Sequence, residues 1–95
     1  MAAYVIVDIE VTNPESFEEY RQRVPPLIAK YGGKYLARGG EMEKVEGDWS
    51  PTRIVVLEFE SMERVKEFYY SEEYAPLKKL RLSATKSNMV MVEGA

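Results

Sequence analysis

The sequence predicts an α+β fold with the element order β-α-β-β-α-β, in which an antiparallel sheet carries its helices on one face. Four short β-type runs are bounded by turn signals, and the first and third of them are rich in β-branched residues. Apolar residues recur at helical spacing between the first and second run and between the third and fourth. The 95 residues suffice for one domain only, so we expect a single domain over residues 1–95.

The predicted strands are separated by segments rich in glycine, proline or asparagine. Gly32 and Gly33 end the first helix, and a second glycine pair follows the second strand. Residues 41–51 are acidic, and their Gly-Asp and Ser-Pro pairs are typical of a hairpin-like connection. The strands are expected at residues 3–11, 34–38, 53–60 and 88–92.

The first helix is expected to begin at Pro14, because Asn13 is a favourable N-cap and proline suits the first helical position. The pair Pro25-Pro26 lacks amide hydrogens and disfavours helical geometry before it, so it should break or kink this helix. A second helical stretch follows Ser61, and a further turn begins at Ser71. We expect helical segments at residues 14–24 and 26–31, and a later apolar face made by Val65, Phe68, Tyr69, Tyr74, Leu77 and Leu80.

Composition excludes several kinds of site. The chain has no Cys and no His, which removes disulfides, thiolate nucleophiles, the commonest transition-metal ligand and the usual haem ligand. A formal net charge of -3 with well-mixed signs argues against a nucleic-acid surface. The acidic residues of 41–48 do not match the spacing of a calcium-binding loop. We therefore expect no cofactor, no metal and no nucleic-acid partner.

We expect no targeting signal at the beginning of the sequence. Met1 is followed by Ala2-Ala3-Tyr4 without basic residues, and no apolar run approaches the roughly 18 residues that a membrane span requires. We therefore expect a cytoplasmic protein that does not contact a membrane.

Two of the predicted strands contain continuous apolar runs, at residues 5–7 and 54–57. An antiparallel sheet with one wet face should instead alternate apolar and polar side chains, so both faces of this sheet should be largely buried. The helices cover one face. We expect a second copy of the chain to cover the other, in a two-fold homodimer.

Five segments together carry a resemblance to a known family. They are Tyr-Gly-Gly at 31–33, Arg-Gly-Gly at 38–40, Glu-Gly-Asp-Trp at 46–49, Arg-Ile-Val-Val-Leu-Glu-Phe at 53–59 and Ser-Glu-Glu-Tyr at 71–74. Through them the chain resembles the domain of unknown function 1330 family over nearly its whole length. That family is similar to the dimeric α/β-barrel superfamily, whose ferredoxin-like subunits pair and whose members include cofactor-free monooxygenases, lactone isomerases and haem enzymes. The resemblance implies this fold and dimerisation, and it implies no particular reaction.

Arg38, Asp8 and Glu58 are the candidate catalytic residues. Arg38 lies in a strand and is flanked by glycines that would let a ligand approach, and a guanidinium holds a carboxylate, enolate or phosphate by two parallel hydrogen bonds. Asp8 and Glu58 interrupt apolar strands and would form an acid/base pair if they met on one face. The alternative is structural, an ion pair of Arg38 with Asp8 or Glu58.

Aromatic residues on the helical stripes suggest a pocket between helices and sheet for a small aromatic or carbonyl compound. The alternative is that these side chains only fill the core. Trp49, on the acidic connection, would serve either as a lid over that pocket or as an anchor of the dimer interface. The candidate pocket residues are Tyr20, Tyr31, Tyr69 and Tyr74.

Three hypotheses about function follow. The first is an uncharacterised homodimeric protein that binds a small anionic or aromatic ligand between sheet and helices. The second is a cofactor-independent enzyme, similar to an isomerase or a monooxygenase, in which Arg38 holds the anion and Asp8 or Glu58 moves the proton. The third is a purely structural dimerisation module.

Overall fold

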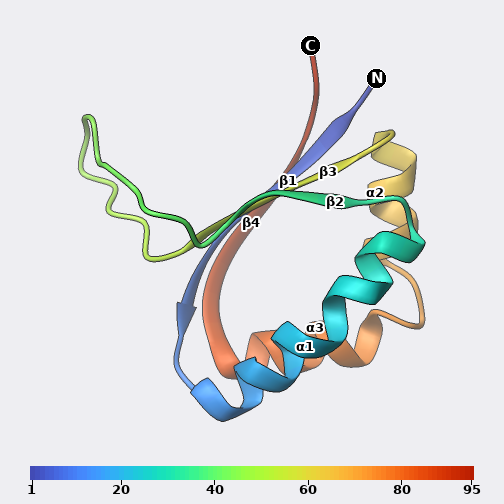
Figure 1. Cartoon of the computed structure of the whole chain (residues 1–95), viewed down its shortest axis with the longest axis horizontal. Helices are drawn as coiled ribbons and strands as arrows, with labels where there is room; N and C mark the ends of the chain where they lie inside the picture. The colour runs from blue at the N-terminus through green and yellow to red at the C-terminus, as the bar shows by residue number, and fades with distance from the viewer.

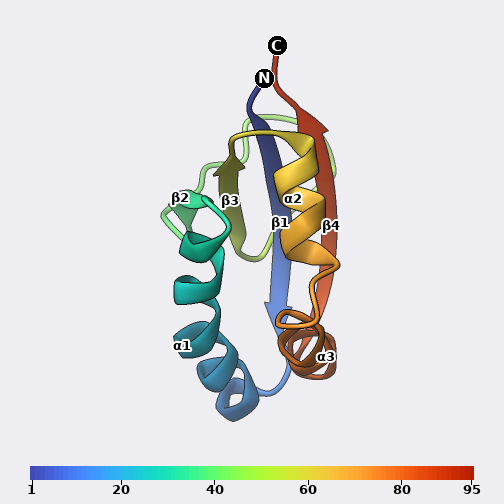
Figure 2. The ribbon, with the colours of Figure 1, turned by 90° about the vertical axis from the view of Figure 1, so that its right-hand side faces the viewer.

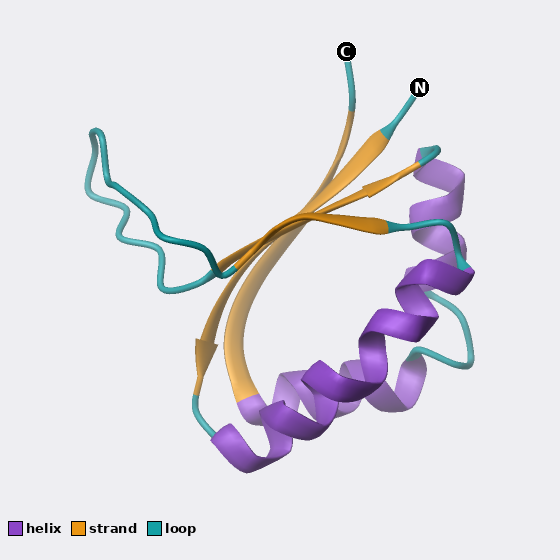
Figure 3. Ribbon diagram, viewed as in Figure 1, coloured by secondary structure: helices purple, strands orange, loops and turns teal.

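The computed structural model describes residues 1–95 as one four-stranded sheet with helices on one side. Figure 1 and Figure 3 show the sheet close to edge-on, with every helix on the same side of it. The strand order is β2-β3-β1-β4 and every neighbouring pair is antiparallel, which confirms the predicted ferredoxin-like fold. The elements are β1 (Ala3–Val11), α1 (Pro14–Lys30), β2 (Lys34–Arg38), β3 (Ile54–Phe59), α2 (Met62–Tyr69), α3 (Ala75–Ala84) and β4 (Thr85–Glu93).

Helix α1 continues through Pro25 and Pro26, so the predicted break at these prolines is wrong. Each proline removes one amide donor from the helical ladder. Val24, Leu27 and Ile28 lie on both sides of the pair and are buried against the rest of the core. Their packing keeps the helix continuous at a position where the local sequence favours an end.

The passage from α3 to β4 also differs from the prediction, because β4 begins at Thr85 and follows the helix without a loop. The carbonyl oxygen of Ala84 accepts hydrogen bonds from the amides of Thr12 and Asn13, at 2.8 and 3.0 Å. The hydroxyl of Thr85 donates to the carbonyl of Arg81 at 2.7 Å. These bonds hold the first residues of β4 beside the end of β1, so pairing begins earlier than the sequence pattern indicated.

Alternate residues of the central strand β1 face the helices. Val5, Val7 and Ile9 are buried on this side, and the helices α1, α2 and α3 pack over them (Figure 2). None of the helices combines the length and the apolar character that crossing a membrane requires. The core that forms here comprises Ala3, Val5, Val7, Ile9, Tyr20, Val24, Leu27, Ile28, Val55, Leu57, Phe59, Val65, Phe68, Tyr74 and Leu77.

The other side of the sheet, which we call the open face, has no helix over it. Val90 and Val92 are 58% and 45% exposed there, although both are aliphatic. Residues 39–53 connect β2 to β3 as a long loop that projects away from the helices (Figure 1). The strand register assigns to the open face Tyr4, Ile6, Asp8, Ile54, Val56, Glu58, Asn88, Val90 and Val92.

Gly33 should be the glycine least tolerant of a side chain. A Cβ atom at this position would lie 2.6 Å from the ring of Phe59 and 2.8 Å from a methyl group of Ile28, both of them buried. We expect Gly33→Ala to lower the free energy of unfolding by about 1–3 kcal/mol through overpacking. Gly40→Ala is the matched control, since no atom lies within 4 Å of a Cβ added at Gly40. Urea unfolding measures both variants, and equal stability of the two would contradict the packing argument.

Candidate functional site

Side chains of the three helices and of all four strands line one cavity on the helix side of the sheet. In Figure 2, α1 lies on one side of this face, and α2 and α3 lie on the other. Nineteen residues line the cavity, and fifteen of them are hydrophobic. The other four are all arginines, and no Asp or Glu is among the lining residues. The space inside that is open to water-sized molecules is about 50 Å³. The cavity therefore combines apolar walls with an excess of positive charge. Its four arginines are Arg21, Arg38, Arg53 and Arg81.

Arg81 is almost fully buried, with 3% of its surface exposed. It lies in the last turn of α3, on the same helical face as Leu77 and one further turn from Tyr74. Its Nε donates to the hydroxyl of Tyr74 at 3.3 Å, and its Nη1 donates to the hydroxyl of Ser87 at 2.6 Å. Burial opposes the charge of Arg81, whereas the oxygen of Tyr74 favours it, and the net effect raises the pKa of the guanidinium. Both side-chain partners of Arg81 are hydroxyl groups, and neither is a carboxylate.

A second phenol joins this network from α1. The hydroxyls of Tyr20 and Tyr74 lie 2.9 Å apart and share one hydrogen bond, although the two residues are 54 positions apart in sequence. Burial raises the pKa of Tyr20 well above its usual value, and the neighbouring Tyr74 raises it further. Tyr20 therefore stays a neutral phenol throughout the physiological pH range.

Arg53, just before β3, has an unusual environment. Its guanidinium lies over the backbone of Gly39, where an added Cβ would come within 2.6 Å of Cζ. Gly39 has a φ of +68°, a conformation that side chains disfavour. The Cζ atom of Arg53 is 5.9 Å from the ring centre of Phe17, and its Nε is buried without a hydrogen-bond partner. The glycine after β2 thus makes room for Arg53, whereas the sequence suggested room for a ligand.

Arg38 reaches the cavity because β2 contains a bulge. Tyr35 pairs with Leu57 and Arg38 pairs with Val55, with the register shift between Tyr35 and Ala37. Strict alternation would place Tyr35 and Arg38 on opposite faces, but the extra residue brings both to the helix side. The Cζ atom of Arg38 lies 4.4 Å from the ring centre of Tyr35, at the exposed end of the cavity.

Charge compensation is uneven among the four arginines. Arg21 is exposed and pairs with the carboxylate of Glu18 at 2.6 Å. Arg38, Arg53 and Arg81 form no ion pair. Three guanidinium groups without a carboxylate partner, one of them buried, give the cavity the chemistry of a site for a negatively charged group.

Asp8 and Glu58 lie on the open face, which is the opposite side of the sheet from Arg38. Glu58 pairs with Lys34, with 3.0 Å between the carboxylate and Nζ. Neither carboxylate pairs with Arg38, so the expected structural ion pair is absent. In the strand register both acids share a face, yet Asp8 is level with Ile54, four residues from Glu58 along β3, roughly 13 Å at strand spacing. The structure does not form the predicted catalytic arrangement.

Asp8 has a different role. Its Oδ1 accepts the amides of Thr52 and Arg53 at 2.9 and 3.1 Å, and its Oδ2 accepts the indole of Trp49 at 3.4 Å. Burial alone would raise the pKa of Asp8, but these hydrogen bonds lower it. Trp49 lies beside the open face, in a hollow with Ile6, and does not line the cavity. Of its two predicted roles, the lid is therefore not formed.

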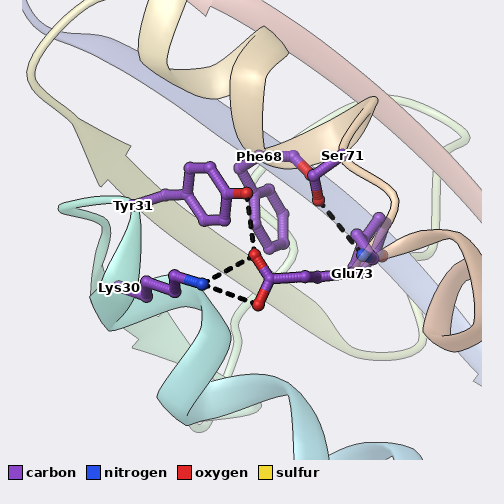
Figure 4. A network of polar contacts seen from close by, with 6 residues as sticks. Lys30, Tyr31, Phe68, Ser71 and Glu73 are labelled. Carbon is purple, nitrogen blue, oxygen red and sulfur yellow. Dashed lines mark hydrogen bonds and ion pairs between the residues drawn. The ribbon is translucent and has the colours of Figure 1, made fainter.

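The predicted pocket tyrosines divide into two groups. Tyr20, Tyr69 and Tyr74 line the cavity, whereas Tyr31 does not. The hydroxyl of Tyr31 donates to Glu73 at 3.1 Å, and Lys30 Nζ contacts both oxygens of the same carboxylate at 2.7 and 2.8 Å (Figure 4). This surface network joins the end of α1 to the segment before α3. Whether the cavity holds a ligand stays a prediction.

The connection between α2 and α3 orients Tyr74. The hydroxyl of Ser71 donates to the carbonyl of Phe68 at 2.8 Å and accepts the amide hydrogen of Tyr74 at 3.1 Å. The predicted helical turn at Ser71 thus positions the phenol that reaches Arg81.

Sequence reasoning missed Arg53, Arg81 and Tyr35 as residues of the site. A signal existed for Arg81, because it continues the apolar helical face of Tyr74 and Leu77. No local pattern marks Arg53.

The comparison with protein families assigns the chain to one family. A family model described as "Domain of unknown function (DUF1330)" matches residues 2–95. No curated protein matches the sequence significantly.

Several solved structures are similar to the chain. A protein of unknown function from Rhodopseudomonas palustris has a TM-score of 0.78 at 16% identity, over 99% of this chain and 82% of the other. SnoaB, a cofactor-independent oxygenase from Streptomyces nogalater, has a TM-score of 0.67 at 11% identity, over 99% and 93%. A dimeric ferredoxin-like protein of unknown function from Bacteroides fragilis has a TM-score of 0.54 at 16% identity, over 98% and 96%. At these identities the likeness shows the fold alone.

Burial of Tyr20 predicts a loss of stability at high pH. The pKa of Tyr20 is raised in the folded protein, so above about pH 10 the unfolded chain releases a proton that the folded chain keeps. The free energy of unfolding should then fall by about 1.4 kcal/mol per pH unit from this group, with no contribution below that pH. We expect the free energy of unfolding of Tyr20→Phe, measured in urea between pH 9 and 11, to lack this fall with pH. Tyr70→Phe, at an exposed position, should keep it. Parallel curves for wild type and Tyr20→Phe would contradict the assignment.

Proposed function

Because the chain belongs to the DUF1330 family, whose description assigns no activity, we propose a function from the geometry of its cavity. The protein binds a small anionic ligand, such as a carboxylate, between its sheet and its helices. The observation that carries this proposal is the set of four lining arginines with no lining carboxylate, of which Arg81 is buried among neutral partners.

The energetics of buried charge support this proposal. A guanidinium removed from water is costly unless hydrogen bonds and opposite charge compensate it. Arg81 uses Nε and Nη1 on neutral hydroxyls, and the Nε of Arg53 has no partner at all. An anion in the cavity would supply the missing charge and acceptors. A purely structural module would have no need of such an arrangement.

The lining also favours a ligand with an apolar part. Fifteen of the nineteen lining residues are hydrophobic, and most of these are valine, isoleucine or phenylalanine. Such walls contribute about 25 cal/mol per Å² of apolar ligand surface that they remove from water. The arginines would then fix the orientation and the walls would supply much of the affinity.

The same proposal includes a two-fold homodimer formed through the open face. Aliphatic side chains such as Val90 and Val92 are exposed there, and nothing in the chain itself covers them. The similar Bacteroides fragilis protein is described as dimeric, which supports pairing by analogy. A two-fold axis through this face would bury the same patch on both subunits.

Carboxylates should stabilise the protein through Arg53. We expect propanoate or benzoate at high concentration to raise the melting temperature of wild type, because a ligand that binds only the folded state stabilises it by mass action. Arg53→Met keeps the apolar stem and loses the charged donors, so affinity should fall roughly 10- to 100-fold. Arg38→Lys should lose less, since it keeps the charge and gives up only the bidentate fork.

The matched control for this experiment is Arg23→Met. Arg23 is exposed on α1, pairs with Glu19 and does not line the cavity. It should bind carboxylates as wild type does. Equal affinities of wild type and a folded Arg53→Met would show that the cavity arginines do not hold the anion.

The dimer prediction has its own variant. Light scattering should give about 22 kDa, twice the 10.9 kDa of one chain. Val90→Lys should shift the mass towards one chain, because it places a charge in the proposed interface. Leu82→Lys is the control, since Leu82 on α3 is 57% exposed, as Val90 is 58% exposed, but lies far from the open face. A stable wild-type monomer at micromolar concentration would exclude the dimer.

A further inference from the structure

The hydrogen-bond donors that line the cavity form two groups, which differ in their exposure to solvent. The first group, which we call the mouth donors, consists of Arg38 and Arg53 with the phenol of Tyr35, all from β2 and the start of β3. The second group, which we call the floor donors, consists of Tyr20, Tyr74 and Arg81. Arg38 is exposed, Arg53 is half-buried, and the floor donors are all buried. The two groups therefore differ in depth and come from different elements.

The floor donors have more hydrogens than the protein has acceptors for them. Nε of Arg81 donates to the oxygen of Tyr74, and the two phenols share one hydrogen bond. Whichever phenol donates in that bond, the proton of the other hydroxyl has no acceptor in the protein. A buried donor without an acceptor is unfavourable, so the floor favours a ligand oxygen. The buried charge of Arg81 favours a negatively charged one.

The mouth donors show the same excess. Arg38 and Arg53 form no ion pair, and the Nε of Arg53 is buried without a partner. Apolar side chains such as Val7, Val55 and Phe68 line the same cavity. Each group of donors thus suits an acceptor, and the walls suit hydrocarbon.

We propose that the ligand of this cavity is a short dicarboxylate, with one carboxylate on the mouth donors and the other on the floor donors. This inference rests on the proposed function and specifies its ligand class. The space inside, about 50 Å³, corresponds to about four water molecules. It suits the inner carboxylate and a short methylene chain, with the outer carboxylate at the exposed mouth. Three arginines without ion pairs suit two negative charges better than one.

The experiment compares dicarboxylates with monocarboxylates of the same chain length. Malonate, succinate and glutarate are titrated calorimetrically at pH 7 beside propanoate, butanoate and pentanoate. The best dicarboxylate should bind at least about tenfold more tightly than its matched monocarboxylate, because it engages both groups of donors. The net charge of the chain is -3, so general attraction does not favour the dianion.

Two variants assign the advantage of the dicarboxylate to the two groups of donors. Arg53→Met and Tyr20→Phe should each reduce the affinity ratio of the matched pair to about twofold or less. Tyr31→Phe is the control, because its hydroxyl binds Glu73 outside the cavity, and it should keep the wild-type ratio. Thermal melts establish that each variant folds. If Tyr20→Phe does not fold, the comparison of dicarboxylates with monocarboxylates on the wild-type protein still tests the proposal.

The possible failures are distinguishable. If monocarboxylates bind and dicarboxylates gain nothing, the two-ended ligand is excluded and anion binding stands. If no acid of either series binds, the proposed function fails as well. A dicarboxylate advantage that survives Arg53→Met or a folded Tyr20→Phe overturns the assignment of that carboxylate to its donors.

Discussion

A buried guanidinium with no carboxylate partner determines how α1, α3 and β4 meet. Arg81 donates to Tyr74 and to Ser87, and Tyr74 bonds in turn to Tyr20 on α1. Removing such a charge from water costs several kcal/mol unless its hydrogen bonds are satisfied, so these partners are structural requirements. Polar groups occupy positions that aliphatic side chains would fill in an ordinary core. The core therefore remains open at this place, and a cavity lies where the helices cover the sheet.

The two faces of the sheet are coupled through the backbone before β3. The carboxylate of Asp8, on the open face, accepts the amides of Thr52 and Arg53. The side chain of Arg53 passes to the other side and lines the cavity. An acid on the proposed dimer face thus holds the backbone that carries a cavity arginine. Trp49 donates to the same carboxylate, so the loop before β3 is tied to this point as well. The position of Arg53 consequently depends on contacts that belong to both faces.

Irregular backbone, rather than regular strand geometry, places the two arginines at the mouth of the cavity. The bulge in β2 turns Arg38 towards the helices and brings it over the ring of Tyr35. Gly39 follows with a positive φ and leaves space for the guanidinium of Arg53. Burial raises the pKa of Tyr35, whereas the adjacent Arg38 lowers it in part, which reflects how closely these groups lie. Two arginines from neighbouring strands meet at one end of the cavity for this reason.

The sequence by itself determined the features that depend on neighbouring residues. The caps Asn13 and Ser61 begin their helices as predicted, since each accepts an amide of the first turn. Element order and fold class followed from these local patterns. The tertiary structure alone decided that α1 continues through its prolines, that β2 bulges and that Arg53, Arg81 and Tyr35 line one cavity. These features depend on packing between residues far apart in the chain, and such packing outweighs local preference because burial of many side chains exceeds the cost of one or two lost backbone hydrogen bonds.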